Sequence, residues 1–142
     1  MNLSLTKLDQ ELPTPKRSHP GDAGLDLYAA QPVILEPGER AVVDTGVAVA
    51  IPEGHAGLLV PRSGLAARHG ITVVNAPGLI DSGYRGPLMA ILLNTGQERV
   101  EIKRGDRIVQ LVVTPVATPE VVLVETLDDT ARGSDGLGSS GR

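Results

Sequence analysis

An aspartate and a tyrosine stand three positions apart in the stretch NAPGLIDSGYRG, residues 75–86. Asp81 follows an apolar pair, and glycines on both sides predict a hairpin. An aspartate is ionised at neutral pH and can accept a proton from an aligned water molecule, while Tyr84 offers a flat surface to a ring. These residues fit a general base beside a ring-binding surface. They also fit a turn-forming carboxylate beside a packed tyrosine.

An arginine and a serine stand at the start of SGLAARH, residues 63–69, the one stretch with a helical pattern. We expect Gly70 to close this short helix. A helix start has unpaired N–H groups and a partial positive charge, so Arg62 and Ser63 at that point indicate a phosphate site. The alternative is that Ser63 is a simple N-cap and Arg62 a surface residue.

Two further stretches carry polar groups without settling their role. Asp22 and Asp26 flank a glycine in DAGLDLY, which fits a magnesium site or an ordinary loop. The three histidines are far apart and show no metal-ligand spacing, which favours surface or hydrogen-bonded histidines. We therefore expect no histidine metal centre.

The final stretch, RGSDGLGSSGR, residues 132–142, combines charge, hydroxyls and glycine with almost nothing apolar. Residues 136–141 spell G-x-G-x-x-G, but a dinucleotide fingerprint needs a following helix, and only one residue follows. Two interpretations remain. The stretch is a frayed terminus, or it is an arm that becomes ordered when it closes over a polyanion.

Composition excludes several classes of protein. The 142 residues suffice for one domain with a real core, and no cysteine is present for disulfide or thiolate chemistry. A net charge of −4, with no Trp and no Phe, argues against a nucleic-acid partner. No secretory leader or run of membrane-spanning length is recognisable, so we expect a cytoplasmic protein without a membrane partner.

Short apolar, β-branched runs separated by glycine and proline turns predict an all-β sandwich or barrel. The runs expected as strands are 41–43, 47–51, 57–60, 71–74, 89–93, 108–113 and 121–124. LMAILL and IVQLVV are apolar at nearly every position, which indicates strands covered on both faces. A partner subunit is the economical cover, so we expect an oligomer.

Taken in order, these stretches resemble the five motifs of the trimeric deoxyuridine triphosphate nucleotidohydrolases, the dUTPases. The motifs read DAGLDLYAA (22–30), PRSGLA (61–66), NAPGLIDSGYRGPL (75–88), GDRIVQL (105–111) and RGSDGLGSSG (132–141). The resemblance implies an all-β, distorted jelly-roll (β-clip) subunit with one short helix. It also implies a homotrimer with three active sites, each built from more than one chain. A β domain, residues 1–131, would carry a flexible C-terminal arm, residues 132–142, that closes over a site.

The resemblance implies a role for each matching residue. Asp81 matches the general base and Tyr84 the residue stacked under deoxyribose. Asp26 matches the carboxylate that reaches the metal through water. The uracil edge would be read by Asn75 and the backbone of Gly78, Leu79, Ile80 and Met89. The phosphates would be bound by Arg62, Ser63, Gly64 and Gln110. The arm would contribute Arg132 at the terminal phosphate, Leu137 over the base, and Gly138, Ser139 and Ser140 as phosphate donors.

The implied reaction is Mg²⁺-dependent hydrolysis of dUTP to dUMP and pyrophosphate, which keeps uracil out of DNA and supplies dUMP for thymidylate synthesis. Two residues depart from the family pattern: Leu137 replaces an aromatic ring, and Asp135 replaces a glycine. We expect a weaker KM and looser closure of the arm, with the chemistry kept. The alternatives are a dCTP deaminase or a bifunctional enzyme of the same architecture, and a non-catalytic trimeric scaffold.

Overall fold

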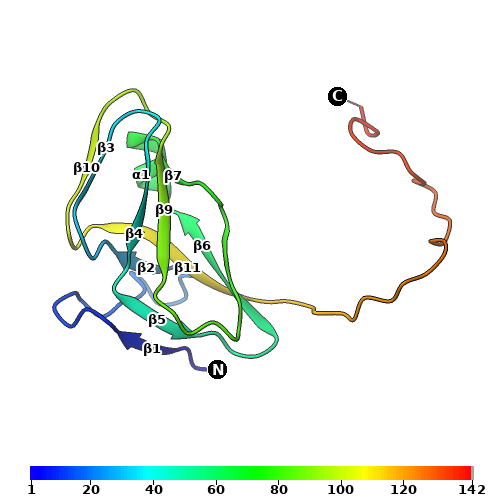
Figure 1. Ribbon diagram of the computed structural model, residues 1–142, viewed down its shortest axis with the longest axis horizontal. Coiled ribbons are helices and arrows are strands. Elements are labelled where there is room, and N and C mark those ends of the chain that lie inside the picture. The colour runs from blue at the N-terminus through cyan, green and yellow to red at the C-terminus, as the bar shows by residue number, and fades with distance from the viewer. Residues whose placement is uncertain (142) are drawn as a thin grey trace.

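Short antiparallel strands and one helix form the folded body of the chain in the computed structural model, which describes residues 1–141 (Figure 1). The elements are β1 (Ser4–Lys7), β2 (Leu25–Tyr28), β3 (Val33–Leu35), β4 (Arg40–Asp44), β5 (Val47–Ala50), β6 (His55–Pro61), α1 (Ser63–His69), β7 (Ile71–Val73), β8 (Gly78–Ile80), β9 (Met89–Asn94), β10 (Val100–Ile102) and β11 (Arg107–Pro115). The predicted all-β fold with one short helix is confirmed.

Two larger sheets enclose the core. One has the strand order β2-β11-β6-β8 and the other β4-β9-β7, while β1 pairs with β5 and β3 with β10. The buried cluster contains Leu27 and Leu111 from the first sheet and Val43 and Leu92 from the second. Burying one such side chain contributes about 1.5–3 kcal/mol, so this shared core joins the two layers.

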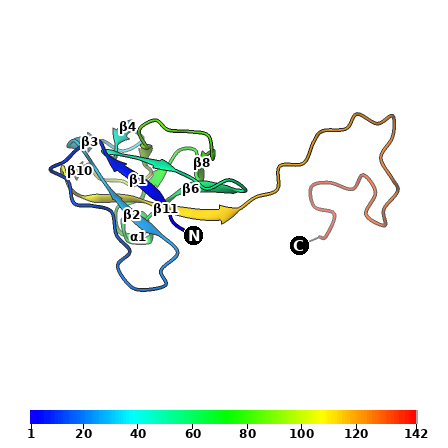
Figure 2. The same cartoon turned by 90° about the horizontal axis from the view of Figure 1, so that it is seen from below.

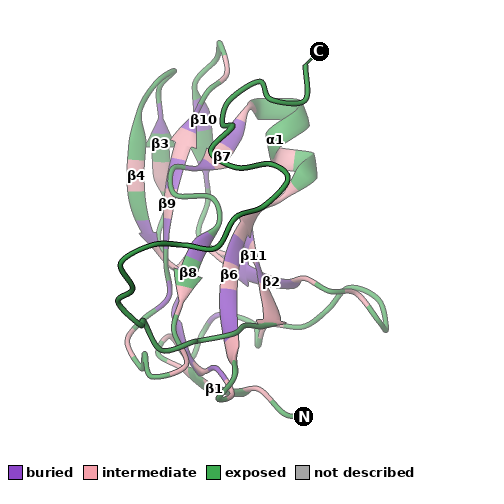
Figure 3. Cartoon of the chain, turned by 90° about the vertical axis from the view of Figure 1, so that its right-hand side faces the viewer, coloured by how far each residue is buried: buried purple, intermediate pink, exposed green. Residues whose placement is uncertain are grey.

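Strand β9 shows why one face of the second sheet remains apolar. Ala90 and Leu92 are buried in the core, whereas Met89, Val42 on β4 and Val74 after β7 are exposed. Figure 3 shows exposed and buried stretches along β4. Alternate residues of a strand point to opposite faces, so a run without polar residues places apolar groups on both. One chain covers only one of these faces.

The buried amide of Asn94 ties β9 to its surroundings. Its Nδ2 donates to the carbonyl oxygens of Leu35 at 2.9 Å and Glu98 at 2.8 Å, and its Oδ1 accepts from the N–H of Gly96 at 2.9 Å. A buried polar side chain is tolerated when its polar atoms are hydrogen-bonded, and both Nδ2 and Oδ1 of the fully buried Asn94 are. Asn94 thereby fixes the turn that leads from β9 to β10.

Helix α1 has a glycine cap at its C-terminal end but no side-chain cap at its N-terminal end. Gly70 closes it with a φ of +68°, and an added Cβ would lie 2.6 Å from the backbone nitrogen of Gly96, so only glycine fits. The N-cap is Arg62, and no side chain caps the helix. The alternative of Ser63 as N-cap is therefore wrong: Ser63 is the first helical residue.

The segment after β11 leaves the body as an extended chain (Figures 1 and 2). Residues 116–141 form neither strand nor helix, and all of them are exposed. The expected strand at 121–124 is wrong, with Val121 98% and Leu123 97% exposed. A strand is stabilised by its neighbours, and this segment has no strand of its own chain beside it. Arg142, the last residue of the predicted arm, lies outside the described residues.

Over residues 1–141, no helix is both long enough and apolar enough to cross a lipid bilayer.

Candidate active site

The first part of the candidate site is a cavity of about 250 Å³ at the hairpin between β8 and β9. It is lined by Leu79, Ile80, Asp81, Tyr84, Pro87 and Met89. Within the described residues 1–141, strand β8 pairs with β6 alone and is the edge of its sheet. Edge strands present backbone N–H and C=O groups that a ligand can bind. The cavity therefore combines an open backbone edge, an exposed carboxylate and an aromatic ring.

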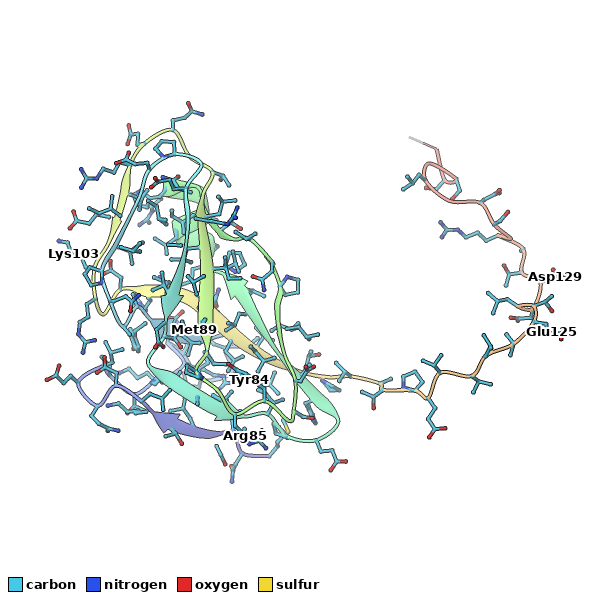
Figure 4. The ribbon with its side chains drawn as sticks, in the orientation of Figure 1. Tyr84, Arg85, Met89, Lys103, Glu125 and Asp129 are labelled. Carbon is cyan, nitrogen blue, oxygen red and sulfur yellow. The ribbon has the colours of Figure 1, made fainter. Side chains whose placement is uncertain are left out.

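A tight turn fixes the groups around this cavity. The N–H of Tyr84 donates to the carbonyl of Asp81 at 3.1 Å, and the Tyr84 hydroxyl donates to the carbonyl of Pro87 at 2.9 Å. Arg85 folds back onto the same turn, with its Nη1 donating to the Ser82 carbonyl at 2.6 Å. Figure 4 shows Tyr84, Arg85 and Met89 together on the body of the molecule. The tyrosine ring is thus held in one orientation.

Asn75 lies beside the same strand. A Cβ added to Gly78 would be 3.4 Å from the Asn75 Nδ2, so the amide lies directly against this glycine. Gly78 is buried, and because it has no side chain the amide of Asn75 can pack against it. Five of the residues expected at the base and the sugar line the cavity: Leu79, Ile80, Asp81, Tyr84 and Met89. Gly78 and Asn75 lie against each other at the start of β8 but do not line the cavity.

The second part is a polar cavity of about 400 Å³. Its lining residues are Ser18, Asp22, Ala23, Gly24, Asp26, Arg62, Ser63, Gly64 and Gln110. The sheet explains this grouping. Asp26 on β2 is the direct cross-strand partner of Gln110 on β11, and Arg62 follows the end of the adjacent β6. This cavity is lined by all four residues expected at the phosphates and also by Asp26.

Asp26 is the electrostatic centre of the polar cavity. It is 8% exposed, and its two carboxylate oxygens accept from Arg62 Nε at 3.0 Å and Arg107 Nη1 at 3.3 Å. A buried charge is tolerated only when it is paired, and here two guanidinium groups balance one carboxylate. Arg62 is further held by its Nη1, which donates to the Arg107 carbonyl at 3.2 Å.

Gln110 crosses the polar cavity because residue 24 is a glycine. Its Nε2 donates to the carbonyl of Pro61 at 3.3 Å. A Cβ added to Gly24 would lie 2.2 Å from the Gln110 Oε1, well inside contact distance. A side chain at residue 24 would therefore displace the Gln110 amide from its present position across the cavity.

The arm residues do not join either cavity within one chain. Arg132 donates from Nε to the carbonyl of Asp135 at 3.1 Å, and Leu137 is fully exposed. Gly138, Ser139 and Ser140 follow in the same exposed segment. Figure 4 shows Glu125 and Asp129 well away from the body, on the chain that leads to them. The two cavities also share no lining residue, so one chain holds three separate parts.

The donor set of the polar cavity can be compared with what Mg²⁺ requires. Among residues 1–141, no group of three or more acidic, histidine or cysteine side chains is arranged to hold a metal directly. Mg²⁺ prefers oxygen ligands, keeps several waters and is commonly held through phosphate oxygens. The oxygens of Asp22, Asp26 and Ser18 at this cavity fit a hydrated ion of that kind.

Sequence reasoning missed Arg107, which contacts both Asp26 and Arg62. A signal for it exists: a charged residue is followed by Ile108 and Val109, which are both buried. Two consecutive buried residues interrupt the alternation of a strand and indicate a bulge beside the charge.

Comparison with known proteins identifies the family of this chain. The chain matches the dUTPase family over residues 10–141 and belongs to that family. It is 55% identical over 146 residues to deoxyuridine 5'-triphosphate nucleotidohydrolase of Mycolicibacterium gilvum, covering 99% of this chain and 95% of the relative. The same-named protein of Rhodococcus erythropolis is 53% identical over 142 residues, covering 99% and 87%.

Solved dUTPase structures have the same fold. A mutant dUTPase of Staphylococcus bacteriophage 80alpha with dUpNHpp superimposes with a TM-score of 0.91 at 34% identity, covering 99% of both chains. A mutant dUTPase from phage phi11 of S. aureus, described for its coordination of a structural Mg(II) ion, gives 0.82 at 33% identity and covers 91% of this chain and 100% of its own.

Proposed function

We propose that this protein hydrolyses dUTP to dUMP and pyrophosphate. The observation that carries the proposal is the exposed Asp81 carboxylate directly after an open strand edge, in a chain whose second cavity collects Arg62, Ser63 and Gln110. The curated relatives at 53–55% identity carry a name for this activity. By lowering dUTP and forming dUMP, the reaction keeps uracil out of DNA and supplies thymidylate synthesis.

The edge of β8 accounts for the choice of base. Backbone groups of Gly78, Leu79 and Ile80, with Met89 and the amide of Asn75, hydrogen-bond uracil as a pairing partner would. Cytosine reverses the donor pattern, and each group left unpaired in a closed site costs about 1–3 kcal/mol. Tyr84 packs under deoxyribose, where a ribose 2′-hydroxyl would collide with its ring.

The polar cavity binds the phosphates. Arg62 offers its remaining guanidinium nitrogen, and Ser63, Gly64 and Gln110 add neutral donors. Asp26 and its neighbours Asp22 and Ser18 would hold Mg²⁺ through water. When bound, the ion neutralises part of the charge on the phosphates.

Asp81 performs the proton transfer. Its carboxylate accepts a proton from a water molecule held in line with the α-phosphorus. The water oxygen forms a bond to this phosphorus, the bond from phosphorus to the bridging oxygen breaks, and pyrophosphate leaves with the electron pair. The protein mainly positions the water and stabilises charge, since the triphosphate brings its own leaving group.

A complete site requires more than one chain, and we propose a homotrimer. The cavity at the hairpin between β8 and β9 and the polar cavity are separate within a chain, and the outer face of the β4-β9-β7 sheet is apolar. The arm, residues 132–142, closes over the site of a neighbouring chain. The exposure of residues 116–131 fits a segment that a neighbour covers, so we retain 1–131 as the β domain.

The test is to incubate the protein with Mg²⁺ and, separately, dUTP, dCTP, dTTP or UTP, and to measure pyrophosphate and ammonia. Pyrophosphate from dUTP alone is expected, and it should disappear when EDTA removes the metal. Ammonia from dCTP would favour the deaminase, and no product from any nucleotide would favour the scaffold. A cytoplasmic location stays a prediction, to be checked by cell fractionation.

A further inference from the structure

A bulge in β11 decides where the side chain of Arg107 lies. Along the pairing with β2, Gln110 faces Asp26 and Arg107 faces Tyr28, with a register shift between Arg107 and Val109. Residues 107 and 110 would point to opposite faces in a regular strand. The extra residue brings both side chains to the face that carries Asp26, and bulges commonly redirect a side chain in this way.

Arg107 lies next to the polar cavity but does not line it. It lines a neighbouring cavity of about 600 Å³, together with Tyr28, Arg99 and Asp106, and it is absent from the lining of the polar cavity. Arg62 lines both cavities. A ligand in the polar cavity therefore meets Arg62 and Asp26, and Arg107 supports these two residues from the far side.

The contacts of Arg107 fix Arg62 twice. Its Nη1 holds the Asp26 carboxylate, which binds Arg62 Nε, and its carbonyl accepts from Arg62 Nη1. Two of the three guanidinium nitrogens of Arg62 are thus bound within the chain. The third, Nη2, is the one left for a ligand among the contacts of residues 1–141.

The charges point the same way. Arg62 and Asp26 alone form a neutral pair, whereas Arg62, Asp26 and Arg107 carry one net positive charge beside a cavity expected to hold a polyanion. Asp26 is nearly buried, so its charge is weakly screened by water, and the second cation beside it gives the cluster a net attraction for phosphate.

We propose that Arg107 is a positioning residue for the triphosphate: it aims Arg62 through Asp26 and keeps the cluster positive, without touching the ligand. This inference rests on the proposed function of the polar cavity. It predicts that Arg107 matters for binding the phosphate chain and little for the attack on phosphorus.

The experiment compares Arg107→Gln, Arg107→Lys and the control Arg99→Gln. Arg99 lines the same neighbouring cavity, and its one ion pair within residues 1–141 is an exposed pair with Glu36 at 3.7 Å. The control therefore removes equal charge without touching Asp26. For Arg107→Gln we expect KM for dUTP to rise about tenfold and kcat to fall less than about threefold. Affinity for dUpNHpp, measured by calorimetry, should fall about as much as KM rises, and affinity for dUMP should fall much less.

Arg107→Lys keeps the charge but not the planar fork, so it should recover part of the loss. Arg99→Gln should leave KM within about twofold of the unmodified protein. The loss in Arg107→Gln should also shrink to within about twofold when both proteins carry Asp26→Asn, because Arg107 acts through Asp26. Thermal unfolding of each variant reports whether it is folded. If Arg107→Gln does not fold, Arg107→Lys is compared with the unmodified protein in its place.

Unchanged dUpNHpp affinity in a folded Arg107 variant would overturn the inference, as would equal losses for dUpNHpp and dUMP, or a control as impaired as Arg107→Gln. These results are distinct from failure of the proposed function. That failure would appear as unmodified protein that binds dUpNHpp but releases no pyrophosphate from dUTP, and the binding comparison would still decide the role of Arg107.

Discussion

Asp81 is exposed at the turn after β8, and it lines the cavity of about 250 Å³ at the hairpin between β8 and β9. Among residues 1–141, none of its side-chain oxygens is bound in an ion pair. Replacing such a side chain changes the free energy of unfolding little, so its substitution tests its role in the reaction without disturbing the fold.

We expect Asp81→Asn to lower kcat for dUTP at least about 10²-fold, since the amide cannot accept the proton of the attacking water. Affinity for dUpNHpp should stay within about threefold. Steady-state kinetics and calorimetry measure the two quantities. Glu53→Gln, in the exposed turn before β6, is the matched control and should behave as the unmodified protein. Wild-type turnover in Asp81→Asn would remove this residue from the reaction.

Leu137 stands where the family resemblance predicts an aromatic ring, and this gives a second prediction at the scale of one residue. Leu137→Phe should lower KM for dUTP about two- to tenfold, because a ring stacked on the base adds about 0.5–1.5 kcal/mol over apolar contact. The control is Leu127→Phe, which places the same ring in the exposed segment outside the motif. An unchanged KM in Leu137→Phe would show that the arm does not cover the base through this position.

At the scale of elements, one ion cluster fastens the N-terminal segment to the turn before β11. Arg104 binds the Asp9 carboxylate with both terminal nitrogens and donates to the carbonyl of Ala30 at 2.6 Å. The hydrogen bond from Arg104 lowers the pKa of Asp9 from 3.8 to about 2. The cluster joins three loops that the sheets leave apart.

This lowered pKa makes stability depend on pH. The folded state holds the Asp9 proton less tightly than the unfolded chain, so the stabilisation is complete above about pH 4 and is lost as the pH falls toward 2. Asp9→Asn should therefore unfold at a lower temperature than the unmodified protein at pH 6, and the difference should narrow as the pH falls to 2. Scanning calorimetry across this range measures it. A difference that does not change with pH would contradict the assignment.

Which elements could be predicted depended on where their stability comes from. The pattern of SGLAARH and Gly70 predicted α1 to the residue, because the signals for a helix and its end are local. The apolar runs at 41–43, 57–60, 89–93 and 108–113 predicted strands, and β4, β6, β9 and β11 are found there. The run at 121–124 has the same composition but is exposed, because a strand also requires a neighbour, which a single sequence does not reveal.

The parts of the site were predictable for a similar reason. Asp81, Tyr84 and the β8 backbone lie within one short stretch, and the sequence placed them together. The pairing of Asp26 with Gln110 depends on register between distant strands, and the sequence alone reached it only through the resemblance to a family. The contact of Arg107 with Asp26 depends on a bulge, which moves one side chain across the sheet.

At the scale of the whole molecule, the separation of the two cavities and the arm leads to a test of assembly. We expect a mixture of Asp81→Asn and Arg132→Ala chains, refolded together, to regain about a quarter of wild-type activity. If Asp81 and Arg132 of one site come from different chains, each of the two residues is intact with a probability of one half in a random mixture. Both are then intact in about a quarter of the sites.

Each variant refolded alone is the control and should stay impaired, and light scattering should report a trimer in every sample. If the mixture is no more active than its two components, Asp81 and Arg132 act within the same chain, and the proposed sharing of sites is incorrect.

The extended course of residues 116–141 has a practical consequence for handling the protein. Arg132 is the only lysine or arginine between residues 108 and 141, and it lies on fully accessible chain. Brief trypsin treatment should therefore cut after this residue before it attacks the sheets, releasing the glycine-rich peptide and leaving an intact body. Saturating nucleotide would slow that cut if the arm folds down over it, so the digestion rate gives a simple readout of closure.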